Sequence, residues 1–248
     1  MTEKLYSVDI NCDLGEGMPC DADIMPYISS CSIACGGHAG NEDSMRQTLA
    51  LAKQYQVKVG AHPSYPDKEN FGRKSLNLSK DALKESLVAQ IKSLKSLINE
   101  FDLSLHHIKP HGALYNDAAR DAELAEHIIE IFKSLLPNVK LYAPFGSELA
   151  KAATNQGIEV VYEVFADRNY NDDLSLVSRT RDNALIHDVE ESYLHIKRML
   201  LDGQVKTIQN NLKPIQANTI CVHSDTQEAV AIVAKLHQAL LDDGFHIQ

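Results

Sequence analysis

Long hydrophobic runs and an excess of positive charge are both missing from this chain. No stretch approaches the roughly 18 apolar residues that a membrane-spanning helix needs. The first four residues, Met1-Thr2-Glu3-Lys4, contain no apolar segment typical of a secretory signal. The formal net charge of -10 argues against nucleic acid or an anionic membrane as a partner, because neither would be attracted. We therefore expect a cytoplasmic protein with a small-molecule substrate, which a local cluster of Lys and Arg can still bind.

Several diagnostic motifs are also missing. The five cysteines form no C-x-x-C motif and lie mostly in apolar runs, so we expect buried thiols in a reducing compartment. A catalytic or metal-binding thiol would be Cys12 or Cys35. No G-x-x-x-x-G-K-[ST] loop, G-x-G-x-x-G turn or G-x-S-x-G elbow is present, which excludes a standard P-loop enzyme, Rossmann dehydrogenase or serine hydrolase. The metal-binding pattern H-E-x-x-H is absent too.

What the chain does contain is a regular alternation of short apolar runs and amphipathic segments. Predicted strands lie at 5–13, 32–35, 57–61, 105–108, 139–143, 159–164 and 219–222. Predicted helices lie between them, and their expected N-terminal caps are Asn41, Ser79, Asp188 with Glu191, and Asp225 with Glu228. Further helices are expected near 118–135 and 147–156. Repeated β–α units imply a parallel sheet, so residues 1–248 should form a single irregular α/β barrel of about seven strands, with a doubly wound open sheet as the alternative.

The first strand carries an unusual polar face. Side chains alternate along a strand, so Asp9, Asn11 and Asp13 share one face, although buried parallel strands are normally apolar on both faces. Glu16 follows between Gly15 and Gly17, which allow a sharp turn. We interpret this stretch as part of a site. The alternative is a solvated edge strand followed by an ordinary turn.

Four histidines occupy equivalent positions in the predicted pattern. His38, His62, His111 and His223 each come at or just after the end of an apolar strand. In a β/α barrel these strand ends form one mouth, where the chemistry takes place. A single histidine there is often structural, but four together indicate function.

Other ionisable residues fall on the same predicted rim: Lys109, Glu163, Asp167, Arg168, Arg73 in the long loop 62–78, and Arg179 and Arg181 in the polar segment 167–183. Two kinds of chemistry follow. The histidines and carboxylates could bind a divalent metal and activate water. They could instead perform acid–base chemistry on a carbonyl or amide, with Lys and Arg binding a carboxylate or phosphate.

Seven ordered motifs resemble those of a known family, the LamB/YcsF family. They are Asp9–Gly17 (DINCDLGEG), Ile33–Gly40 (IACGGHAG), Gly60–Pro63 (GAHP), Phe71–Arg73 (FGR), Lys109–Asn116 (KPHGALYN), Glu163–Arg168 (EVFADR) and Cys221–Asp225 (CVHSD). The resemblance covers about residues 5 to 244. It implies a fold of the glycoside hydrolase/deacetylase type.

The resemblance also implies an activity: the ATP-dependent hydrolytic opening of 5-oxo-L-proline (pyroglutamate) to L-glutamate, with this chain as the A subunit of a 5-oxoprolinase that acts with subunits B and C. ATP, accompanied by Mg²⁺, is the implied cofactor. The expected catalytic residues are Asp13, Glu16, His38, His62 and His111. The expected substrate- or phosphate-binding residues are Asn11, Arg73, Lys109, Glu163, Asp167, Arg168, Arg179 and His223. Asp13, His38, His62 and His111 are the candidate metal ligands.

Two other functions remain open at this point. One is a metal-dependent deacetylase or hydrolase acting on a small amide or carbohydrate, and the other is a scaffold for the partner subunits. The sequence also departs from the family pattern twice. Ser224 replaces a glycine, which puts the local backbone in doubt because Ser disfavours positive φ. The segment 171–179 lacks the usual Gly and Pro, which puts the geometry around Arg179 in doubt.

Overall fold

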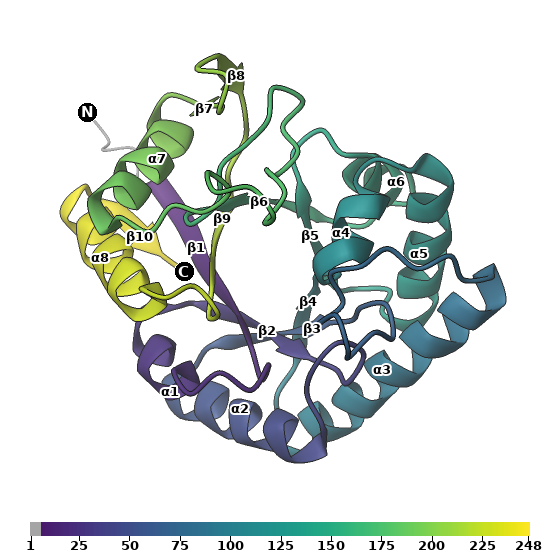
Figure 1. Cartoon of the computed structure of the whole chain (residues 1–248). Helices are drawn as coiled ribbons and strands as arrows, with labels where there is room; N and C mark the ends of the chain where they lie inside the picture. The colour runs from purple at the N-terminus through teal and green to yellow at the C-terminus, as the bar shows by residue number, and fades with distance from the viewer. Residues whose placement is uncertain (1–5) are drawn as a thin grey trace.

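Seven parallel strands close into a barrel in the computed structural model, which describes residues 6–248 (Figure 1). In order around the barrel they are β1 (Tyr6–Leu14), β2 (Ser30–Ala34), β3 (Lys58–His62), β4 (Leu105–Ile108), β5 (Lys140–Pro144), β6 (Val160–Phe165) and β9 (Thr219–His223). The barrel closes because β9 pairs with both β6 and β1. The predicted barrel is thus confirmed and the open sheet is wrong. The predicted start of the first strand at Leu5 lies outside the described residues.

Amphipathic helices surround the barrel, as Figure 1 shows. They are α2 (Glu42–Tyr55), α3 (Lys80–Glu100), α5 (Ala122–Leu135), α6 (Glu148–Asn155), α7 (Val189–Leu201) and α8 (Ala229–Asp242). The predicted caps Asn41, Ser79 and Asp188 are confirmed, since each side chain accepts a hydrogen bond from a backbone N–H of the first turn. Among the helices described, none combines the length and the apolar character that crossing a membrane requires.

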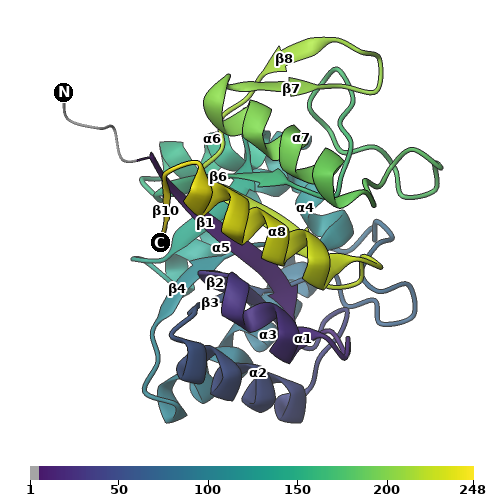
Figure 2. The ribbon, with the colours of Figure 1, turned by 90° about the vertical axis from the view of Figure 1, so that its left-hand side faces the viewer.

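The elements that the pattern missed are all short. They are α1 (Asp21–Ile24), the 3-10 helix η1 (Met25–Tyr27), α4 (Gly112–Ala118), β7 (Gln204–Lys206), β8 (Leu212–Pro214) and β10 (Phe245–Ile247). The longest, α4, has 7 residues, too few to show a hydrophobic period. The hairpin of β7 and β8 lies beside α7 at the top of Figure 2, and β10 pairs with the start of β1.

Two predicted helix boundaries were wrong. The helix expected near 118–135 starts later, because Asp121 caps it at Ala122, and it ends at Leu135 as expected. The last helix begins at Ala229, and Asp225 does not cap it. The Asp225 carboxylate instead accepts hydrogen bonds from two arginines.

The polar face of β1 points into the barrel, and the solvated-edge alternative is wrong because both faces are buried. Asp9 lies toward the amino ends of the strands, where it accepts hydrogen bonds from the hydroxyls of Ser30 (2.7 Å), Tyr142 (3.2 Å) and Thr219. Asn11 lies one layer higher and donates to Thr219 at 2.7 Å. The barrel therefore has a polar interior that leads from Asp9 toward the mouth, while the alternate side chains of β1 join the apolar core.

Candidate functional site

The turn after β1 places Glu16 at the barrel mouth. Gly15 (φ 74°) and Gly17 (φ 90°) both adopt the left-handed conformation, which costs glycine little. The Gly15 N–H donates to the Asp21 carboxylate at 2.8 Å, which fixes the turn. Glu16 is buried as a result, although it lies in a loop.

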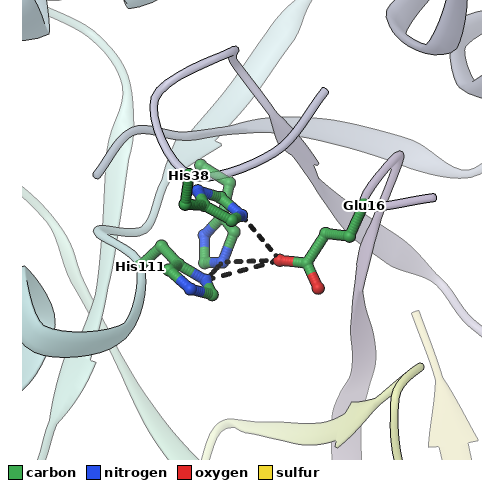
Figure 3. A group of neighbouring side chains, drawn as sticks. Glu16, His38 and His111 are labelled. Carbon is green, nitrogen blue, oxygen red and sulfur yellow. Dashed lines mark hydrogen bonds and ion pairs between the residues drawn. The ribbon is translucent and has the colours of Figure 1, made fainter. Parts of the chain in front are cut away.

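Three of the four predicted histidines gather around Glu16. His38 Nε2 lies 2.8 Å from Glu16 Oε1, and His111 Nδ1 lies 3.4 Å from the same oxygen (Figure 3). The rings of His38 and His111 stack with their centroids 3.5 Å apart. His62, the last residue of β3, brings its Nε2 within 2.9 Å of His111 Nδ1. We refer to Glu16, His38, His62 and His111 as the histidine cluster.

The long loop between β3 and α3 closes over this cluster. The Phe71 carbonyl accepts a hydrogen bond from His111 Nε2 at 2.9 Å, and the Gly72 carbonyl accepts one from the Ala113 N–H at 2.9 Å. A Cβ on Gly72 would lie 2.7 Å from the Cβ of His38, so only glycine fits there. The loop thus helps to form the site.

Lys109 is the cation that pairs with two carboxylates inside the barrel, Asp13 and Glu163. Its ammonium group is buried and lies 2.6 Å from Asp13 Oδ1, 2.9 Å from Glu163 Oε1 and 2.9 Å from Asn11 Oδ1. The Lys109 ammonium donates hydrogen bonds to the Asn11 and Glu163 oxygens and to Cys221 Sγ at 3.4 Å, while Asp13 is its close ion-pair partner. Tyr115 donates to the second oxygen of Glu163 at 2.7 Å.

The pKa values of several acids and bases in and beside the histidine cluster are shifted from their usual values. Burial, together with the negative charge of Asp13, raises the pKa of Glu16 to about 7. Burial also lowers the pKa of His38 to about 4 and holds that of His111 well below its usual value, with the neighbouring rings adding to the effect on His111. For Asp13 burial acts in the opposite direction, but the charges of His62 and Lys109 outweigh it and hold the pKa of Asp13 well below its usual value. Glu16 is therefore the carboxyl suited to exchange a proton near neutral pH.

A cavity of about 330 Å³ opens beside the cluster. The predicted site residues that line it are Asp13, His62, Arg73, Lys109, His111, Glu163, Arg168, Arg179 and His223. Asn11, Glu16, His38 and Asp167 are buried and do not line it.

The arginines at this cavity differ in their environments. Arg73 and Arg179 share the carboxylate of Asp225. Arg168 is buried and donates from Nη2 to the Val177 carbonyl at 2.7 Å, while its Nε has no hydrogen-bond partner among the described residues. Burial and the nearby charge of Arg179 lower the pKa of Arg168 to about 10. A free donor on a buried guanidinium is suited to a carboxylate or phosphate ligand.

His223 lies apart from the histidine cluster. Its Nδ1 lies 3.0 Å from both carboxylate oxygens of Asp167, and Thr226 donates to the same carboxylate. Burial alone would raise the pKa of Asp167, but the His223 charge and these hydrogen bonds hold it well below the usual value. Asp167 thus orients His223 at the cavity wall.

Sequence reasoning missed Tyr115 and gave Asp225 the wrong role. Tyr115 and Asp225 both lie inside sequence motifs named above, and that position was the one signal that could have pointed to their roles.

The doubt about the backbone at Ser224 is resolved. Ser224 is not among the described residues with positive φ, and its hydroxyl donates to the Asp13 carbonyl at 2.9 Å. In the segment 171–179 it is Leu174 that adopts the left-handed conformation (φ 65°). The expectation of buried thiols is confirmed for all cysteines except Cys20, which is half-buried, and burial raises the pKa of Cys35 to about 12, away from a reactive thiolate.

Two groups of side chains could hold a metal ion. Ligand atoms of Glu16, His38, His62 and His111 all lie within 4.8 Å of one another. Asp13, Cys221 and His223 form a second group by the same measure. Asp13, expected beside the three histidines, lies 3.2 Å from His62 through Oδ2, so it adjoins the first group as well.

Ionisable side chains gathered at the carboxyl ends of the strands of an irregular β/α barrel are the arrangement found in barrel enzymes, whose active sites lie at that mouth. The chain belongs to the LamB/YcsF family, whose model matches residues 8–248.

Two similar proteins support this assignment over nearly full length. A protein from Neisseria meningitidis serogroup A, named as the A subunit of 5-oxoprolinase, is 42% identical over 98% of this chain and 99% of its own. The crystal structure of a lactam utilization protein from Thermus thermophilus has 33% identity and a TM-score of 0.90, covering 98% of this chain and 99% of its own. The peptidoglycan deacetylase PdaC from Bacillus subtilis has a TM-score of 0.52 at 10% identity, covering 100% of this chain and 89% of its own, and shares the fold alone.

Proposed function

We propose that this chain is the A subunit of a cytoplasmic 5-oxoprolinase, which hydrolyses the ring amide of 5-oxo-L-proline to give L-glutamate. Subunits B and C are its proposed partners, and ATP with Mg²⁺ is the proposed cofactor of the complete enzyme. The names of the similar proteins support the reaction. The observation that carries it is a single cavity lined by three arginines and, beside them, Asp13, His62 and His111.

The cavity provides the two functions that this substrate requires. Arg168 and Arg179 are placed to bind the carboxylate of the lactam through charge-assisted hydrogen bonds. Asp13, His62 and His111 then face the ring amide, with Glu16 behind them. Water attacks the ring carbonyl carbon, the C–N bond breaks, and the proton lost by water ends on the amine nitrogen. Glu16, whose pKa is about 7, can hold that proton between the two steps.

The proposed ATP requirement follows from the chemistry of the lactam. A five-membered lactam is an unreactive amide whose closure is favourable, so hydrolysis benefits from activation. Transfer of the terminal phosphoryl group of ATP to the lactam oxygen would release ADP and make the ring carbon more electrophilic, and hydrolysis of the activated ring would then release inorganic phosphate with glutamate. The chain contains no P-loop motif, so we assign ATP use to the complete enzyme rather than to particular residues here.

A coupled assay tests this proposal. The purified chain is incubated with 5-oxo-L-proline and ATP, with and without subunits B and C, while glutamate and ADP are followed together. We expect glutamate and ADP in equal amounts with all three subunits and little glutamate from this chain alone. Hydrolysis of amides or acetylated sugars by the chain alone, unaffected by ATP, would favour the deacetylase-type alternative.

Removal of the Arg179 charge should weaken substrate binding. In Arg179→Met we expect KM for 5-oxo-L-proline to rise about 10- to 100-fold with a smaller change in kcat, because a charge-assisted hydrogen bond contributes about 1.5 to 3 kcal/mol. Steady-state kinetics of the assembled enzyme measures both constants. Arg181→Met is the matched control, since Arg181 is exposed and does not line the cavity. Equal KM values in the two variants would contradict the role of Arg179.

A further inference from the structure

Two histidines of the cluster have their tautomers fixed by the backbone. His62 Nδ1 lies 2.7 Å from the Lys109 carbonyl, and His111 Nε2 lies 2.9 Å from the Phe71 carbonyl. A carbonyl only accepts hydrogen bonds, so each of these ring nitrogens carries the proton. When a ring is neutral, its other nitrogen is then a bare acceptor. These two acceptors, His62 Nε2 and His111 Nδ1, lie 2.9 Å apart and point at each other.

Carboxylate oxygens crowd the same point. Glu16 Oε1 lies 3.4 Å from His111 Nδ1 and 3.8 Å from His62 Nε2. Asp13 Oδ2 lies 3.2 Å from His62 Nε2. None of these atoms can donate when the carboxyls are ionised and the rings are neutral, so the lone pairs repel one another. His38 is the exception, because its Nε2 can donate to Glu16 at 2.8 Å (Figure 3).

The distribution of charged side chains also indicates that a positive charge is missing beside Glu16. Lys109 is the cation paired with Asp13 and Glu163. Within residues 6–248, the ion pairs of Glu16 are with histidines and none is with a Lys or Arg. A buried carboxylate without a cation is costly, so a positive charge between Glu16 and the two rings would relieve both the repulsion and the charge imbalance.

We propose that His62, His111 and Glu16 bind one divalent transition-metal ion of the Zn²⁺ type, with His38 orienting the Glu16 carboxylate. Metal–ligand bonds of about 2.0 to 2.1 Å place neighbouring ligand atoms roughly 3.0 to 3.4 Å apart, close to the 2.9 to 3.8 Å between these three residues. Imidazole ligands favour such ions over Mg²⁺, which prefers oxygen. The backbone carbonyls that hold the two rings match the outer contacts typical of metal-bound histidines.

The ion would lie at the cavity wall, since His62 and His111 line the cavity. Two histidines and one glutamate leave coordination positions open for water or a carbonyl oxygen, as in catalytic zinc sites. The ion would supply Lewis acidity for water attack on the lactam, and this role rests on the proposed function. Binding of the ion does not rest on it.

Metal titration of the isolated chain tests the proposal without reference to activity. The chain is treated with a chelator and dialysed, then titrated by calorimetry with Zn²⁺, Co²⁺ and Mg²⁺ in turn. We expect one Zn²⁺ or Co²⁺ per chain, no measurable Mg²⁺ binding, and visible absorption bands from bound Co²⁺. Loss of a direct ligand should cost more than the roughly 10- to 100-fold typical of outer contacts, so His111→Ala should bind Co²⁺ at least about 100-fold more weakly.

Matched variants make the outcome decisive. Glu16→Gln keeps the shape of the side chain and should weaken binding strongly, while His187→Ala, an exposed histidine outside the cluster, should bind normally. Circular dichroism establishes that each variant is folded. A folded chain that binds no Zn²⁺ or Co²⁺ would overturn the proposal and assign the short His62–His111 contact to a shared proton. Full binding in both Glu16→Gln and His111→Ala would also overturn it. Normal metal binding without lactam hydrolysis would instead count against the proposed function alone.

Discussion

Replacing His111 by Ala should lower kcat of the assembled enzyme by about 10²- to 10⁴-fold, the range typical of lost acid–base or ligand chemistry. His111 is the residue that connects the parts of the site. Its ring stacks on His38, its Nδ1 faces His62 and Glu16, and it lines the cavity. Glutamate release with saturating 5-oxo-L-proline and ATP measures the effect.

The control for this change must separate chemistry from folding, because His111 Nε2 also holds the loop at Phe71. His111→Gln retains an N–H donor for that carbonyl but not the imidazole. We expect it to restore the melting temperature without restoring kcat. His187→Ala should leave kcat unchanged, since His187 is exposed and outside the cluster. Recovery of activity in His111→Gln, or full activity in His111→Ala, would show that the ring only supports the loop.

Much of the fold could be predicted because its signals are local. Strands such as 219–222 are short apolar runs, and the long α3 repeats Leu87, Ile91 and Leu94 with helical spacing. The site could be located by the same logic, since β/α barrels bring the carboxyl ends of their strands to one mouth. His62 and His223 are the last residues of β3 and β9, so their positions followed directly from the strand pattern.

What the sequence could not predict depends on contacts between distant segments. Asp225 with Glu228 resembles a helix cap, but Arg73, 152 residues away, occupies the Asp225 carboxylate instead. The tautomers of His62 and His111 are set by the carbonyls of Lys109 and Phe71, which no spacing rule relates to them. The division of the four histidines into a cluster of three and a separate His223–Asp167 pair likewise required the structure.

The polar barrel interior makes a strong prediction about stability. Replacing Lys109 by Met should lower the free energy of unfolding by about 3 to 5 kcal/mol, because Asp13 and Glu163 would remain buried without their cation. Chemical denaturation of the isolated chain measures this difference. Lys151→Met is the matched control, since the Lys151–Glu148 pair lies at the surface and should contribute less than about 1 kcal/mol.

A second set of variants tests whether charge is the cause. Asp13→Asn and Glu163→Gln remove the two carboxylate charges while keeping the side-chain shapes. Combined with Lys109→Met, they should recover a substantial part of the lost stability, although the residues are in contact and their effects should not add. If Lys109→Met alone proves as stable as the parent chain, the two buried carboxylates do not depend on the Lys109 charge. If the combined variant is as unstable as Lys109→Met, the loss arises from packing of the long Lys109 side chain and not from unpaired charge, which would leave Lys109 a space-filling role between β1 and β6.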